Sequence, residues 1–234
     1  MVESSGQKSA GERTGRRERT AGIRGPARSS GAVRRRPVQQ RSIERFERML
    51  EACAQVLDEV GYDRLTTREV AERAGVPIGT LYQFFHGKQE LCRALAERNL
   101  ELFTRRLAAR FHDMTVTRWS DTAAVVVAEF VAMKRTVPGF AAIDFGHSGA
   151  RMPSILDVEQ AQEDNEHVAH RLAEFGVQTV GLAPNAELEQ VLRVAVEVVD
   201  AVMHVAFRGG LPGDPRLIAE AEWLLRSYLA ARLD

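Results

Sequence analysis

Residues 66–88 read TTREVAERAGVPIGTLYQFFHGK, and this stretch decides the fold. Thr66 followed three residues later by Glu69 is a capping box, which opens a helix because each residue can satisfy an unpaired amide of the other. Gly75 ends that helix, and Pro77 suits the first position of a second one. Two short helices joined by a glycine-containing turn predict a DNA-binding helix-turn-helix unit.

The second of these helices is the one that we expect in the major groove. Its compact first residues, Pro77, Ile78, Gly79 and Thr80, permit a close approach to base edges. The Gln83 amide is a candidate base reader, because it can pair with an adenine edge.

Four further side chains suit the phosphate backbone. The Thr66 and Thr67 hydroxyls lie beside the free amides of a helix N-terminus, which favour an anion. Tyr82 and Lys88 suit phosphate contacts as well. The competing interpretation of the segment is a helical hairpin without a role on DNA.

The run GVPIGTLYQFFHGKQEL, residues 75–91, resembles the recognition-helix signature of the TetR family of bacterial transcriptional regulators. The similarity extends over about residues 43–95. Phe84 stands where the family more usually has His or Tyr, and His86-Gly87 replaces Pro-Ser or Pro-Asn. Phe84 cannot bond a phosphate, so we expect it to make an apolar contact, for instance with a thymine methyl group.

Apolar residues recur at spacings of three and four along most of the remaining chain, which predicts an all-α protein. The helices are expected over residues 43–60, 66–74, 77–84, 88–112, 119–136, 140–146, 153–175, 185–208 and 215–232. These ranges predict a disordered basic tail over 1–41 and an N-terminal three-helix helix-turn-helix domain over 42–90. A larger helical ligand-binding and dimerisation domain is expected over 91–234. Cys53 falls on an apolar stripe and is interpreted as a core residue.

The composition limits where the protein works. An apolar fraction of 44% is ordinary for a packed domain, and no apolar run is long enough to cross a bilayer. The N-terminus has no apolar secretory segment, and two cysteines make no disulfide framework. We therefore expect a cytoplasmic protein without a membrane partner.

The charges are unevenly distributed although the net charge is zero. Residues 1–42 hold eleven Lys or Arg and three Glu, whereas residues 43–91 hold six basic and nine acidic residues. The Arg34–Arg36 cluster is a candidate contact for phosphates or a minor groove. The alternative is a solvated tail that contributes weak attraction only.

The resemblance implies a homodimer formed through the last two helices of each subunit. Two features of the sequence favour the same interpretation. The segment 185–208 is apolar over more than one face, and the segment 215–232 carries Trp223, Leu224 and Tyr228. The alternative is that these side chains fill the core of one subunit.

The resemblance also implies a small-molecule pocket within the C-terminal helices. Aromatic and Met side chains suit an adaptable apolar cavity, with Asp and His as polar anchors. The candidates are Phe103, Trp119, Phe130, Met133, Phe140, Asp144, Phe145, His147 and Met152. They favour a largely apolar or aromatic effector, although core packing would explain each of them equally well.

Taken together, the sequence predicts a ligand-responsive DNA-binding regulator, in the first instance a repressor of a palindromic operator in double-stranded DNA. A metal-controlled regulator is an alternative, since Glu163, His167 and His170 share one helical face that His147 and His204 could join. An adaptor that no longer binds DNA is another alternative. Neither an enzyme nor a cofactor is expected, because the sequence has no phosphate loop, nucleophile elbow or ordered metal motif.

Overall fold

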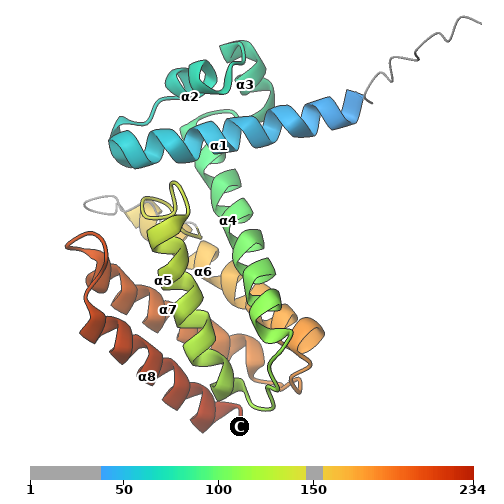
Figure 1. Ribbon diagram of the computed structural model, residues 1–234, viewed down its shortest axis with the longest axis vertical. Coiled ribbons are helices and arrows are strands. Elements are labelled where there is room, and N and C mark those ends of the chain that lie inside the picture. The colour runs from blue at the N-terminus through green and yellow to red at the C-terminus, as the bar shows by residue number, and fades with distance from the viewer. Residues whose placement is uncertain (1–37, 146–154) are drawn as a thin grey trace, which may run out of the picture. The chain divides into compact units, whose positions relative to one another are not determined.

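The computed structural model describes the backbone of residues 38–145 and 155–234 and the side chains of residues 40–145 and 164–234. Within these ranges every regular element is a helix (Figure 1), as expected from the sequence. The elements are α1 (Val38–Arg64), α2 (Thr67–Ala74), α3 (Ile78–Phe84), α4 (Lys88–Phe111), η1 (Trp119–Thr122), α5 (Ala123–Thr136), α6 (Ile155–Phe175), η2 (Gly176–Val180), α7 (Leu188–Phe207) and α8 (Pro215–Arg232). No helix in these ranges is long and apolar enough to cross a membrane.

The first helix is longer than the sequence pattern predicts. It begins at Val38, so residues 38–41 belong to α1 and not to the tail expected over 1–41. The rest of that tail lies outside the described residues. Gly61 interrupts α1 with a positive φ of 73°, which agrees with its expected role as a helix stop, and one further turn follows to Arg64.

The helices α1, α2 and α3 bury their apolar faces in one core together with the first turns of α4. Cys53 lies in this core, fully buried, as predicted. Burial and a hydrogen bond with Cys92 raise the pKa of the Cys53 thiol, so this sulfur is an unreactive packing group.

The helix α4 belongs to two cores. Its first turns place Leu91 and Leu95 among α1, α2 and α3. Further along, Phe103 and Leu107 pack with residues of α5 and α6 in a second cluster. The helix therefore runs from the helix-turn-helix unit into the C-terminal helices (Figure 1).

Two arginines on α4 also hold α5 through a single buried carboxylate. The Glu129 side chain is 5% exposed and accepts hydrogen bonds of 3.2 Å from Arg106 and from Arg110. A buried carboxylate is stable only when it is paired in this way. The remaining C-terminal core is formed by α5 to α8, with α7 and α8 packed against each other.

The helix predicted over 140–146 is wrong. Residues 137–145 form consecutive turns, in which the Phe140 amide bonds the Val137 carbonyl and the Ile143 amide bonds the Gly139 carbonyl. Gly139 has a positive φ of 75°, which ends the regularity of α5. A Cβ atom at Gly139 would lie 2.8 Å from the Ala54 Cα atom, so only glycine permits this approach to α1.

Gly176 was expected to end a helix, but it begins the π-helical turn η2. A Cβ atom at Gly176 would lie 2.3 Å from a ring carbon of Trp119, so the glycine makes room for the indole. The helical path then continues to Val180 and ends at Gly181, where φ is 79°. Single π-helical turns are frequent at functional sites.

Candidate nucleic-acid interface and effector cavity

The local rules at the start of α2 operate as predicted. The Thr66 hydroxyl accepts a hydrogen bond of 3.2 Å from the Glu69 amide, and Gly75 takes the left-handed conformation with φ of 64°. This geometry fixes the turn between α2 and α3. The N-terminus of α2 and the whole of α3 are thereby held as one unit.

A hydroxyl pair joins the two helices at their outer surface. Thr67 Oγ1 and Tyr82 Oη share a hydrogen bond of 3.2 Å across α2 and α3. Both are predicted phosphate contacts, so the structure brings these two candidates together. The Tyr82 side chain keeps 51% of its surface exposed.

One face of α3 packs inward and the other is open. Leu81 is fully buried, whereas the candidates for DNA contact on the opposite face are exposed or partly exposed. The exposed ones are Pro77, Ile78, Gly79, Tyr82 and Gln83, with Thr80 partly exposed. An exposed isoleucine and tyrosine on a helix of seven residues form an unusual surface for a solvated helix.

Phe84 is less available than the sequence suggests. Its ring is half-buried in an aromatic cluster, with ring centroids 6.1 Å from Phe46 and 6.3 Å from Phe85. The residue therefore anchors α3 on α1, and only part of it remains for an apolar contact with DNA.

Lys88 has partners within the chain. Its ammonium donates to the Tyr62 carbonyl at 3.0 Å and lies 4.2 Å from the centroid of the Tyr62 ring. The first residue of α4 thus fastens the end of α1. The sequence identified Lys88 as a phosphate contact and gave no sign of this second role, because Tyr62 is distant along the chain.

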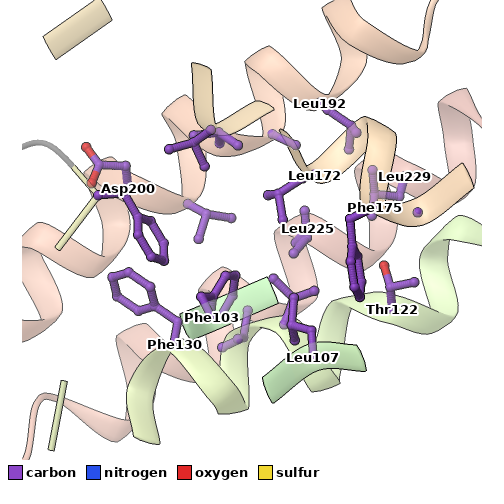
Figure 2. A pocket seen from close by; sticks show the side chains of 18 of the residues that line it. Phe103, Leu107, Thr122, Phe130, Leu172, Phe175, Leu192, Asp200, Leu225 and Leu229 are labelled. Atoms are coloured by element: carbon purple, nitrogen blue, oxygen red, sulfur yellow. The ribbon is translucent and has the colours of Figure 1, made fainter. Parts of the chain in front are cut away.

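A cavity of about 100 Å³ lies among the C-terminal helices. Its wall comes from α4, η1, α5, α6, η2, α7 and α8, so the bundle encloses it on several sides. Figure 2 shows mainly apolar side chains pointing into it, with Asp200 at one end of the view and Thr122 at the other. The described residues that line it most closely to the predicted set are Phe103, Trp119, Phe130, Asp144 and Phe145.

The other candidates for the pocket have different positions. Met133 and Phe140 are fully buried and do not line the cavity, although the Phe140 ring packs 5.5 Å from Phe130 and 5.3 Å from Phe145. Phe140 therefore supports the wall from behind. His147 and Met152 lie outside the described residues.

Three polar residues of the cavity were missed: Thr122, Asn165 and Asp200. Asp200 belongs to a polar stripe along α7 that sequence reasoning assigned to solvent. That stripe passes from the surface to the cavity, since Glu197 on the same helix accepts a hydrogen bond of 2.9 Å from Asn165. A polar stripe looks the same in sequence whether it faces water or an internal cavity.

The turns between α5 and α6 connect the cavity to the helix-turn-helix unit. Asp144 and Phe145 line the cavity, whereas Ile143 is 1% exposed and lies in the core of α1, α2 and α3. The Asn99 amide on α4 donates to the carbonyls of Ile143 and Asp144 at 3.1 and 3.3 Å. A displacement of the wall would therefore reach both α1 and α4.

The histidines considered for metal binding point to separate partners. His167 contacts Glu97 at 2.9 Å, and His170 contacts Glu189 at 3.3 Å. His204 lies exposed on α7, and the side chains of His147 and Glu163 are outside the described set. Among the side chains that the structure describes, no three ligand groups converge.

Comparison with known proteins agrees with both halves of this arrangement. Residues 49–95 match the family described as bacterial regulatory proteins, tetR family, and residues 117–233 match the tetracyclin repressor-like C-terminal domain. A TetR-family transcriptional regulator from Streptomyces coelicolor is 42% identical, with a TM-score of 0.67 over 80% of this chain and 98% of that one. A regulator from Rhodococcus sp. RHA1 is 24% identical, with a TM-score of 0.57 over 82% and 96% of the two chains.

A curated relative adds support for the helix-turn-helix unit alone. An HTH-type transcriptional regulator from Mycobacterium bovis is 36% identical over 77 residues. The matched region spans 31% of this chain and 40% of that relative.

Proposed function

This chain belongs to the TetR family of bacterial transcriptional regulators, and from that premise we propose that it is a dimeric repressor which a small, largely apolar molecule releases from a palindromic operator. The observation that carries the proposal is the coexistence of an exposed α3 and an internal cavity that share α4 and the turns 137–145.

The exposed face of α3 supports binding in the major groove. Gln83 presents an amide from a helix whose opposite face is anchored by Leu81. The Thr67 and Tyr82 pair lies beside it and is suited to the phosphate backbone. Since the surrounding unit is acidic on balance, affinity must come from a few such groups and from the presence of two copies.

The exposed apolar side chains of α7 and α8 support dimerisation. Val194, Val198 and Val205 are 39%, 41% and 44% exposed along α7, and Trp223 on α8 is 61% exposed. A second copy would remove this surface from water, which is favourable in proportion to its area. The dimer would place two α3 helices about one turn of DNA apart.

Release by an effector requires that the effector bind two conformations with different affinities. A molecule that enlarges the cavity would press on Asp144 and Phe145, and the turns that carry them contact α1 and α4. The spacing of the two recognition helices would then change. By reciprocity, operator DNA would weaken effector binding to the same extent.

The decisive experiment selects operator sequences from a randomised DNA library with the full-length protein. We expect a palindrome, and we expect Gln83→Ala to lose about 1–3 kcal/mol on that palindrome with altered preference at one position of each half-site. Gln178→Ala is the matched control, because this exposed glutamine lies on η2, far along the chain from α3. Failure to enrich any sequence would favour the adaptor, and an unchanged preference would remove Gln83 as a reader.

A further inference from the structure

The polar groups on the cavity wall are mostly hydrogen-bond acceptors. Among the described lining residues, Thr122, Asp144, Asn165 and Asp200 are the polar ones, and none is Lys, Arg or His. A ligand that meets this wall must bring its own donors.

The hydrogen bonds within the protein strengthen this bias. The Thr122 hydroxyl donates to the Trp119 carbonyl at 2.7 Å, which leaves its oxygen as an acceptor. The Asn165 amide nitrogen donates to Glu197 at 2.9 Å. The side chains thus direct donors toward the protein and present oxygens elsewhere.

The two aspartates set the sign of the charge. Asp144 is held by Lys134 at 3.0 Å and by the Phe145 amide at 2.7 Å, so its charge is compensated. Asp200 also interacts within the chain, but an ionised carboxylate offers about four lone-pair positions and can accept a further donor. An anionic ligand here would be buried beside a carboxylate, which is costly.

The remaining wall is aromatic and the space is small. The Phe145 ring centroid lies 5.0 Å from Phe103 and 5.7 Å from Phe130, and Figure 2 shows Phe130 at the same end of the view as Asp200. A cavity of about 100 Å³ is somewhat smaller than the apolar cavity of about 150 Å³ that binds benzene. A single ring therefore fits with modest expansion, and aromatic faces attract a cation as well.

We propose that the effector is a small aromatic ammonium compound, with its ring among Phe103, Phe130 and Phe145 and its ammonium donating to Asp200. This assignment rests on the proposed function of the cavity. It names one chemical class, and it excludes carboxylate and phosphate analogues of the same size.

Three probes of one shape test the assignment: benzylamine, benzyl alcohol and benzoate. Calorimetric titration of the full-length dimer without DNA should give the order benzylamine, then benzyl alcohol, then benzoate, with at least a tenfold difference between the first and the last. Asp200→Asn should remove most of that difference. Asp113→Asn, a change at an exposed aspartate of the loop after α4, should keep it.

The outcomes separate the two proposals. Benzoate binding as tightly as benzylamine, no binding of any probe, or an Asp200→Asn protein with the wild-type order would overturn the ligand class. Folding of the variant is checked by its circular dichroism and by operator binding. If benzylamine binds in the expected order but leaves operator affinity unchanged, the ligand class stands and the release mechanism fails.

Discussion

The Gly139 amide donates a hydrogen bond of 2.8 Å to the Asp58 carboxylate, and this bond joins the turns beside the cavity to α1. The same turns place Asp144 and Phe145 on the cavity wall. The relationship gives the effector a path to the helix-turn-helix unit in addition to α4.

Asp58→Ala should remove this bond and lower the free energy of unfolding by about 1 kcal/mol. Asp58→Asn is the matched control, because its amide oxygen can still accept from Gly139. Urea unfolding gives the stabilities. With an effector in hand, the alanine variant should also show a smaller change of operator affinity on effector binding. Equal stability and equal response in the two variants would show that the bond does not couple the two parts.

The cap of α2 gives a second prediction. Thr66→Ala should destabilise the protein by about 1 kcal/mol, because the Glu69 amide loses its acceptor. Thr66→Ser retains a hydroxyl and should unfold close to the wild type. Thermal unfolding compares the two, and a wild-type transition for the alanine variant would contradict the capping role.

The carboxylate between α4 and α5 gives a third prediction. Glu129→Ala should lower the unfolding free energy by about 2 kcal/mol, since two charge-assisted hydrogen bonds to Arg106 and Arg110 are lost. Both arginine side chains are at least 37% exposed, so water can solvate them after the change. Arg110→Ala leaves Glu129 with Arg106 and should cost less. A larger loss for the arginine variant would show that Glu129 is not the centre of this contact.

The apolar surface of α7 gives a fourth prediction. Val198→Asp should shift the protein from dimer to monomer in analytical ultracentrifugation, because the dimer would have to bury an unpaired charge. Met114→Asp is the control, since Met114 is 46% exposed against 41% for Val198 but lies outside α7 and α8. If both variants kept the same mass, the dimer would use another surface.

The ion pair between α1 and α2 gives a prediction on pH. Two hydrogen bonds of 2.5 and 2.7 Å from Arg73 lower the pKa of the Glu59 carboxyl. A lowered pKa means that stabilisation is present above the ordinary glutamate pKa and disappears as the pH falls through the folded-state value.

The wild type should therefore be more stable than Glu59→Gln at neutral pH, and the difference should vanish in acid. Urea midpoints measured at several pH values test this expectation. Glu47→Gln, at another exposed glutamate of α1, serves as the control. A difference between wild type and Glu59→Gln that is constant with pH would exclude the ion pair as its cause.

The elements that sequence predicts best are those set by neighbours in the chain. Thr66 with Glu69 and the left-handed Gly75 specify α2 and its turn without reference to the rest of the molecule. The boundaries of α8, Pro215–Arg232, coincide with the prediction because Asp214 caps the helix and Pro215 begins it.

The features that sequence misses depend on contacts between distant residues. The turns at 137–145 replace a predicted helix, because Gly139 must lie against Ala54 on α1. Lys88 bonds the Tyr62 carbonyl, and Asp200 faces a cavity where its spacing suggested water. Periodicity reports that a helix has two faces, but it does not report what each face meets.

Ile143 bears on how this protein can be dissected. The residue follows α5 in the chain yet is buried in the core of α1, α2 and α3. A fragment that stops near residue 95, where the family similarity of the DNA-binding half ends, would lack this side chain and would expose the apolar surface that it covers. The DNA-binding half is therefore not an autonomous folding unit at its obvious boundary, and its last structural component is encoded almost fifty residues downstream.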